Sequence, residues 1–214
     1  MPTPPLSGRR AQAAVNDRLI LAAARVVFVD DPEAPISAVA ERAHVGISAL
    51  YRRYPSKDAL LQKISLDGLL AYTAEVEAAL ADEGDAWTVF ARFVSRCVEG
   101  GANSLTRRLA GAFTASEELQ REGRRSYLAT QTLLERMKAA GALREDFEVG
   151  DLHFTLEQLQ TTRVGSEERT RELRQRYVAL LLDALRAPAR SPMPGEPPTW
   201  HEISDRYVAK PKAD

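Results

Sequence analysis

The chain has 214 residues, of which 44% are hydrophobic and 28% are charged, and its formal net charge is -1. This balance is typical of a globular protein, and the lack of any apolar run of about 18 residues predicts that no segment spans a membrane. The single cysteine, Cys97, excludes an internal disulfide and suits a reducing cytoplasm, and the segment MPTPPLSGRR lacks the apolar core of a signal peptide.

Proline is concentrated at both ends of the chain. Three of the twelve prolines lie in residues 1–8 and six more in residues 188–214, so we predict a tail at each end. Arg9 and Arg10 close the first tail, where they fit either a basic arm that touches nucleic-acid phosphates or a solvated arm without a partner. The basic excess in residues 1–60 is too small to identify a partner by itself.

The first predicted helix spans residues 16–29, with Asn16 as a plausible N-cap. Its apolar residues recur at helical spacing and are expected to face inward: Ile20, Ala23, Ala24, Val27 and Phe28. The following residues, 30–35, are predicted to form a loop. Its acidic residues have no metal-ligand spacing and are expected to be solvated.

Residues 36–57 predict two short helices joined by a tight turn. In the first helix Val39, Ala40 and Ala43 share one face. The turn at 44–46 needs a residue with positive φ, for which His44 is a permitted choice, and Gly46 can cap the next helix. That second helix runs from Ile47 to about residue 54, where Pro55 ends it, with Leu50 facing inward.

A second helix that carries small, hydroxyl and cationic residues across a short turn has the geometry of a helix-turn-helix, whose second helix enters the major groove of DNA. An ordinary helical corner is the alternative. The adjacent arginines Arg52 and Arg53, between Tyr51 and Tyr54, favour the DNA-binding interpretation because a corner does not need them.

The run AERAHVGISALYRRYPSKDALL resembles the DNA-binding signature of the TetR family of transcriptional regulators. It matches the family pattern at Ala40, Ala43, Val45, Leu50, Tyr51, Tyr54, Lys57 and Leu60, whereas His44 stands where glycine is usual. The resemblance implies an all-α protein, with a helix-turn-helix domain (9–55), a helical effector-binding and dimerisation domain (56–187) and a proline-rich tail (188–214).

The resemblance also implies a role for individual residues in binding a double-stranded operator. Bases are expected to be read by Ser48, Ala49, Tyr51 and Arg52. The DNA backbone is expected to be held mostly by Ser37, Arg53, Tyr54 and Lys57. Gly46 and Ile47, at the start of the helix, are also expected to bind DNA. Ser37 could equally be a plain helix cap.

Downstream, the pattern predicts a long helix over 56–81, capped by Ser56, and further helices over 86–99, 117–140, 149–162 and 167–187. Ser104 could cap another helix that carries Leu105, Leu109, Ala112 and Phe113. A small-molecule cavity among these helices would be lined by Phe90, Phe93, Cys97, Leu109, Phe113, Tyr127, Thr130 and Met137. The same residues would equally describe a packed core, and the resemblance is what implies an effector there.

The last long helix keeps a nearly heptad apolar stripe, through Leu173, Tyr177, Leu180, Leu181, Ala184 and Leu185. Such a stripe packs either along a partner or against its own domain. By resemblance the final two helices, 149–162 and 167–187, would form a homodimer interface, which suits a palindromic operator. Trp200, Ile203 and Tyr207 could dock the tail onto the body.

Three histidines without metal-ligand spacing, and no recognisable nucleophile or phosphate-binding loop, predict no enzyme, no metal and no cofactor other than a small-molecule effector. The expected function is a cytoplasmic, DNA-binding transcriptional regulator, by default a repressor, that binds as a dimer and is released by an effector. The alternatives are a helical small-molecule-binding protein without a DNA role, or an enzyme with an unrecognised site.

Overall fold

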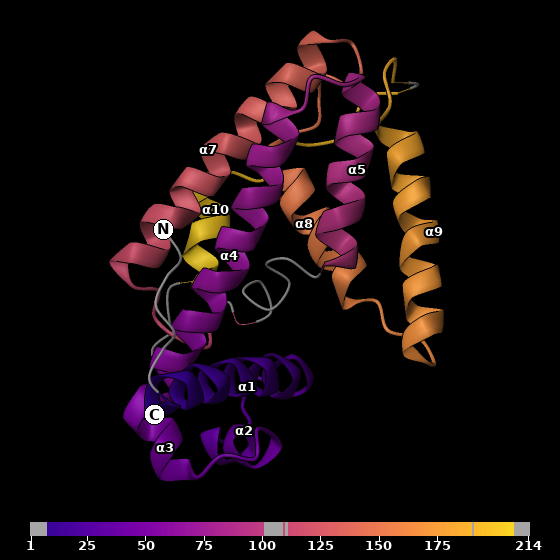
Figure 1. Ribbon diagram of the computed structural model, residues 1–214. Coiled ribbons are helices and arrows are strands. Elements are labelled where there is room, and N and C mark those ends of the chain that lie inside the picture. Colours follow the sequence, from indigo (N-terminus) through magenta and orange to yellow (C-terminus); the bar gives the residue numbers. More distant parts are fainter. Residues whose placement is uncertain (1–7, 101–108, 110, 190, 208–214) are drawn as a thin grey trace.

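The structure is a computed structural model that describes residues 8–100, 109, 111–189 and 191–207. In these ranges all regular elements are helical (Figure 1): α1 (Gly8–Asp30), α2 (Ile36–Arg42), α3 (Ile47–Arg53), α4 (Lys57–Ala81), α5 (Ala86–Glu99), α7 (Glu117–Ala139), α8 (Val149–Thr161), α9 (Glu167–Leu185), α10 (Trp200–Ser204) and the 3-10 helix η1 (Asp205–Tyr207). The predicted all-α fold is confirmed.

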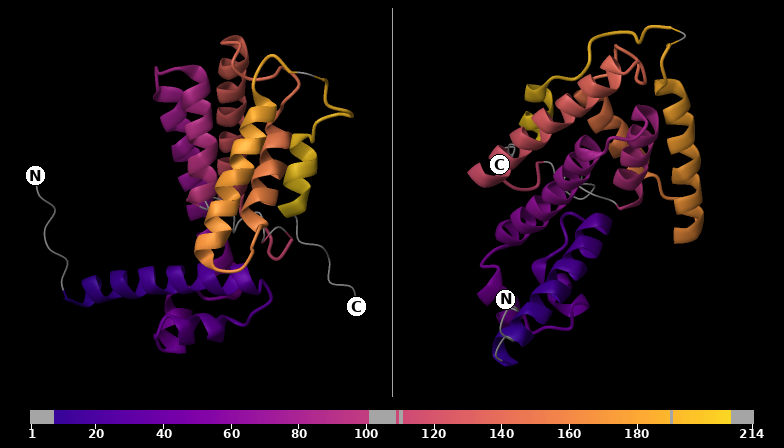
Figure 2. Two further views of the ribbon diagram at one scale, coloured as in Figure 1. Left: turned by 90° about the vertical axis from the view of Figure 1, so that its right-hand side faces the viewer. Right: turned by 45° about the horizontal axis from the view of Figure 1, so that its top comes forward.

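Helices α1, α2 and α3 form a small head below the bundle of longer helices (Figures 1 and 2). The head core contains the apolar residues that were predicted to face inward, including Ile20, Phe28, Val39 and Leu50. The start of α1 was predicted wrongly, because the helix begins at Gly8 instead of Asn16. Arg9 and Arg10 therefore belong to the first turns of a helix and not to a tail.

Helix α4 connects the head to the body. Its predicted cap is confirmed, since the Ser56 hydroxyl accepts a hydrogen bond from the Ala59 amide at 3.0 Å. Its 25 residues span roughly 38 Å at 1.5 Å per residue. The first half of α4 packs in the head core through Leu60 and Leu61, and the second half packs in the body core through Tyr72 and Val76.

The body is a bundle in which α4 and α7 lie side by side, with α5, α8 and α9 completing the other side (Figure 1). Serine and aspartate side chains cap the starts of three of these helices: Asp85 for α5, Ser116 for α7 and Ser166 for α9. Gly141, with φ of 65°, adopts the left-handed conformation expected just after α7. The predicted limits of α5, α7, α8 and α9 agree with the observed ones to within two residues.

The segment between α5 and α7 differs from the prediction. Ser104 and Leu105, the expected start of a helix there, lie outside the described residues. Leu109 and residues 111–113 form turns instead of a helix. Leu109 and Phe113 are buried in the head core. The α5 aromatic residues, with which they were predicted to line one cavity, belong to the body core.

The chain after α9 folds back onto the body. The backbone of Ala187 donates to Ala142, the Met193 amide donates to the Asp146 carboxylate at 2.8 Å, and α10 then packs beside α7 and α8 (Figure 2). Ile203 is 5% exposed, so the possible docking of the tail is confirmed. Among the helices that the structure describes, none is long and apolar enough to cross a membrane.

Candidate nucleic-acid interface and ligand cavity

The turn between α2 and α3 has the geometry that a helix-turn-helix requires. His44 has φ of 52°, as predicted for the residue that replaces glycine, and it is the one described non-glycine residue with positive φ. The Val45 amide donates to the Ala40 carbonyl at 3.0 Å, which closes the turn on the end of α2. Gly46, in extended conformation, precedes α3 and leaves its first amides open to an external acceptor.

Helix α3 is attached to the head by one face only. Leu50 is completely buried, whereas Tyr51 and Ile47 are 46% and 40% exposed, and Ser48 and Arg52 are exposed as well. Ala49 is partly buried beside them. No hydrogen bond or ion pair within the described residues engages the Arg52 side chain. The face predicted to read bases is therefore mostly exposed, on a helix that lies in the head below the bundle (Figure 1).

Arg53 and Tyr54, at the end of α3, are bound to α1. Asp17 accepts hydrogen bonds from Arg53 Nε at 2.8 Å and from the Tyr54 hydroxyl at 2.7 Å. Tyr54 is 5% exposed and its hydroxyl is bound to Asp17, which leaves it little surface for the predicted contact with the DNA backbone. Its role is to fix the orientation of α3. The Arg53 side chain, 61% exposed, keeps a solvent-facing edge.

The electrostatics of this cluster follow from its geometry. The hydrogen bond from Arg53 holds the pKa of the Asp17 carboxyl below its ordinary value, and the Tyr54 hydroxyl acts in the same direction. Burial, followed by the neighbouring carboxylate, raises the pKa of the Tyr54 phenol. Both shifts favour a charged Asp17 and a Tyr54 that remains a proton donor.

We expect Asp17→Ala to lower the free energy of unfolding by about 1–3 kcal/mol, because the buried Tyr54 hydroxyl loses its acceptor. Asp17→Asn keeps an acceptor and loses the charge, which faces an exposed Arg53, so we expect a cost of less than about 1 kcal/mol. A lowered pKa in the folded state means that the charge stabilises the protein above the ordinary value of 3.8 and that this contribution disappears as the pH falls through the lowered value.

Urea unfolding of the wild type and both variants, at pH 7 and in steps below pH 4, measures these effects. The difference between the wild type and Asp17→Asn should shrink as the pH falls. A cost that is equal for alanine and asparagine, or independent of pH, would contradict the assignment of Asp17 as the anchor of α3.

Two further residues of the predicted interface flank α3. Ser37, in the first turn of α2, is exposed and does not cap that helix, because the N-cap residue is Pro35. Lys57, the first residue of α4, is partly buried, and its Nζ atom lies 5.4 Å from the centroid of the Phe28 ring. The ring supports the side chain of Lys57 at the head, next to the end of α3.

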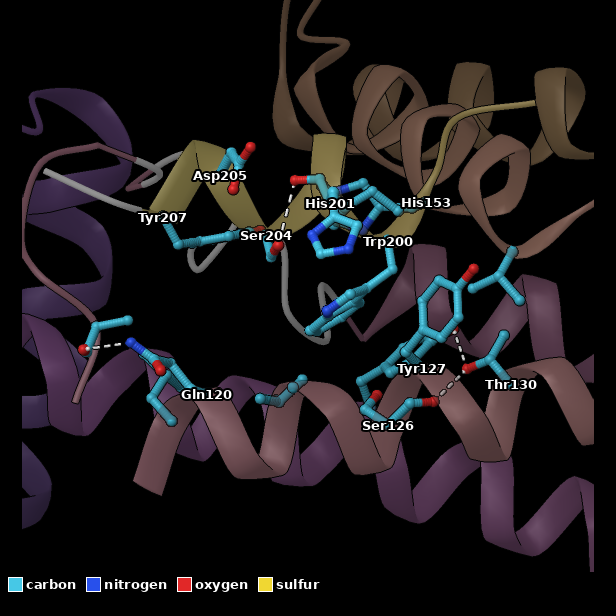
Figure 3. Close-up of a pocket in the computed structure, with 17 residues that line it drawn as sticks. Gln120, Ser126, Tyr127, Thr130, His153, Trp200, His201, Ser204, Asp205 and Tyr207 are labelled. Atoms are coloured by element: carbon cyan, nitrogen blue, oxygen red, sulfur yellow. Dashed lines mark hydrogen bonds between the residues drawn. The ribbon is translucent and has the colours of Figure 1, made fainter. Parts of the chain in front are cut away.

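A cavity of about 380 Å³ lies in the body (Figure 3). Helix α4 contributes Leu69 and Tyr72, and α8 contributes Val149 and His153. The α7 side of the cavity is formed by Leu119, Gln120, Gly123, Ser126, Tyr127 and Thr130, with Ala115 just before the helix. The Tyr72 and Thr130 hydroxyls are 3.1 Å apart and hydrogen-bonded to each other. The remaining wall comes from the C-terminal segment 200–207.

The composition of this cavity differs from the predicted lining. Of the eight expected residues, only Tyr127 and Thr130 line it. Phe90, Phe93, Cys97 and Met137 are at most 2% exposed and fill the body core, and Leu109 and Phe113 belong to the head core. The alternative interpretation of these apolar stripes as packed core is the correct one for all six.

Sequence reasoning missed the residues of the C-terminal segment. Trp200, His201 and Ile203 come from a helix that the proline-rich composition concealed. A signal was present, since Thr199 and Glu202 form a capping box in which the Glu202 amide donates to the Thr199 hydroxyl and the Thr199 amide donates to Glu202. Thr-x-x-Glu followed by an apolar residue is a signature of a helix start.

The cavity lies where the two cores meet. Leu69 and Leu119 line it and also belong to the head core, whereas Tyr72 and Val149 line it and belong to the body core. A molecule bound here would touch both cores at once. It would therefore affect how the head is held against the body.

Helix α9 has an exposed apolar face. Tyr177 and Leu180 are 44% and 59% exposed, and Ala184 is exposed on the same side. Leu181 and Leu182 turn inward and pack against the body core. The stripe predicted for this helix is thus divided between its own domain and solvent. Within the described residues, there is no group of three or more His, Cys, Asp or Glu side chains that could hold a metal ion.

Comparison with known proteins agrees with this architecture. The family model for bacterial regulatory proteins of the tetR family matches residues 20–64, and the model for the SbtR-like transcriptional regulator C-terminal domain matches residues 84–187. A comparison with curated protein sequences gives no match.

Among solved structures, the TetR regulator SCO0520 from Streptomyces coelicolor is 25% identical, with a TM-score of 0.55, and the similarity covers 81% of this chain and 99% of that one. A TetR regulator from Mycobacterium vanbaalenii is also 25% identical, with a TM-score of 0.53 and coverage of 83% and 99%. LfrR from Mycobacterium smegmatis, solved with proflavine, shares the fold at 22% identity, a TM-score of 0.60 and coverage of 84% and 99%.

Proposed function

The chain belongs to the TetR family of bacterial transcriptional regulators, and we propose that it represses transcription by binding a palindromic operator as a homodimer. The observation that carries this proposal is the exposure of Ser48, Tyr51 and Arg52 on α3, which follows α2 after a tight turn at His44. Ser48, Ala49, Tyr51 and Arg52 would read bases in the major groove.

Contacts to the DNA backbone would position this helix without specifying the sequence. We assign them to the start of α3, at Gly46 and Ile47, and to the flanking side chains of Ser37, Arg53 and Lys57. Arg53 can serve while it remains bound to Asp17, because its side chain is 61% exposed. Since its target is the operator, we expect the protein to act in the cytoplasm and assign it no catalytic role.

We further propose that the second subunit packs on the exposed face of α9, together with α8. Tyr177, Leu180 and Ala184 supply an apolar surface that is exposed among the residues that the structure describes. A two-fold axis through such a surface would present two heads to two half-sites of the operator, whose spacing the dimer would set.

An effector would act from the cavity between the two cores. Leu69 of α4 and Leu119 of α7 belong to the head core and also line the cavity. A molecule that separates these two side chains would therefore change the orientation of α4 relative to the head. We expect this coupling between effector and operator to amount to about 1–3 kcal/mol. No other cofactor enters the proposal.

A footprint of the purified protein on DNA that flanks its own coding region tests this function. We expect a protected palindrome at submicromolar protein, and release of the protein on addition of a compound that fills the cavity. Protection without two-fold symmetry would contradict the dimer, and no protection at low salt would contradict operator binding itself.

A further inference from the structure

We propose that the C-terminal segment 199–207 is part of the effector site, which thereby selects aromatic compounds that are uncharged or cationic. This inference rests on the proposed function, in which the cavity holds the effector. The segment lies beyond both matched family models, which end at residues 64 and 187. It adds Trp200, His201, Ile203, Ser204, Asp205 and Tyr207 to the cavity wall.

The segment closes one side of the cavity (Figure 3). Side chains of α10 and η1 lie opposite those of α7, with the Trp200 indole directed toward Tyr127. The two ring centroids are 5.1 Å apart in an edge-to-face arrangement. Without this segment, the cavity would lose six of its lining residues.

Two anchors hold the segment in place. Arg206 donates to both carboxylate oxygens of Glu157 in α8 at 2.7 Å, and its guanidinium lies 4.9 Å from the centroid of the Phe154 ring. At the other end, Pro198 passes directly over Gly150 of α8. A Cβ atom on Gly150 would lie 2.1 Å from the Pro198 carbonyl oxygen, so glycine is required for this approach.

The chemistry of the wall defines the class of ligand. Aromatic rings surround the cavity, from Tyr72, Tyr127, Trp200 and Tyr207, with two histidines between them. Asp205 is the only residue of formal charge among the described lining residues, and none of them is lysine or arginine. Two arginines lie near the cavity without lining it. Arg206 is hydrogen-bonded to Glu157, and the exposed Arg124 lies 5.7 Å from the Trp200 ring centroid.

An anionic ligand would lose its hydration in this cavity without gaining a cation. A flat aromatic ligand, in contrast, can stack on the rings, and a positive charge on it would face their π-systems. The polar groups that could orient a ligand include the hydroxyls of Ser126, Thr130 and Ser204 and the side-chain amide of Gln120.

The test uses two fluorescent probes with one skeleton, uncharged N-phenylnaphthylamine and its sulfonate, anilinonaphthalene sulfonate. We expect the uncharged probe to bind the full-length protein at least tenfold more tightly than the sulfonate. Trp87 lies outside the cavity, so Trp87→Phe leaves Trp200 as the only tryptophan. Energy transfer from Trp200 to the bound probe then reports binding at this wall.

Gly150→Ala is expected to displace the segment 199–207 by a clash with Pro198, although Gly150 itself does not line the cavity. Alanine suits a helix better than glycine, so α8 is not weakened, and the clash falls on Pro198. We expect it to weaken binding of the uncharged probe at least tenfold and to reduce the energy transfer. The matched control is Gly8→Ala at the start of α1, outside the cavity. Its Cβ would meet no atom within 4 Å, and it should leave probe binding within about twofold of the wild type.

Operator binding without probe should be the same in all these variants, which separates this inference from the proposed function. Should Gly150→Ala fail to fold, Glu157→Gln removes the charged partner of Arg206 and is expected to weaken the uncharged probe several-fold. The inference is overturned if both variants bind that probe as tightly as the wild type, or if the sulfonate binds as tightly as the uncharged probe.

Discussion

A Leu180→Asp variant is expected to be monomeric at micromolar concentration and to lose most of its affinity for the operator. Leu180 is 59% exposed at the centre of the uncovered face of α9. Burying one leucine contributes about 1.5–3 kcal/mol, and a two-fold interface contains the residue twice. The loss of about 3–6 kcal/mol corresponds to a rise of roughly 100-fold to 10,000-fold in the dimer dissociation constant.

Sedimentation velocity measures the oligomeric state, and binding to a full operator compared with a single half-site measures the consequence. The affinity for a half-site should be unchanged, because α3 is far from α9. Leu128→Asp is the matched control, since Leu128 is 47% exposed on α7. A Leu180→Asp protein that remains dimeric, or a Leu128→Asp protein that dissociates, would place the interface elsewhere.

An Arg52→Ala variant is expected to bind its operator about 10-fold to 100-fold more weakly, with one base preference lost in each half-site. A bidentate arginine contact to a guanine contributes about 1–3 kcal/mol of discrimination, and Arg52 is exposed without an internal partner among the described residues. Arg53 is the neighbouring arginine but is bound to Asp17, so it cannot replace Arg52.

Titration of operator variants, with each base at each half-site position, locates the lost preference. Arg121→Ala is the control, because the Arg121 side chain lies on α7, outside the helix-turn-helix, and is 71% exposed. An unchanged preference at every position, with weaker binding to all sequences, would mean that Arg52 contacts phosphates instead of bases.

Much of the head could be predicted because its determinants are local. The buried face of α2, the positive φ of His44, the start of α3 after Gly46 and the Ser56 cap all follow from residues within one or two turns of each other. The burial of Tyr54 could not be predicted in this way. Its acceptor, Asp17, is 37 positions earlier in the chain, and only the packing of α1 against α3 brings them together.

The cavity could be predicted even less well. An apolar stripe has the same sequence pattern whether it packs on another helix or borders an open space, so Phe90 and Phe93 could not be told apart from true lining residues. Trp200 lies 73 positions after Tyr127, and its place depends on a return path through residues 187–198 that composition marks only as proline-rich.

The amino-acid sequence by itself determined the helices and the outward helix-turn-helix, since caps, turns and helical periodicity act over a few residues. The tertiary structure alone decided which apolar residues fill a core and which surround a cavity. It also decided that Tyr54 supports α3 from inside and that the C-terminal segment completes the wall of the cavity. Each of these features depends on contacts between segments that are remote in the chain. Whether a side chain is buried then depends on which distant segment packs against it.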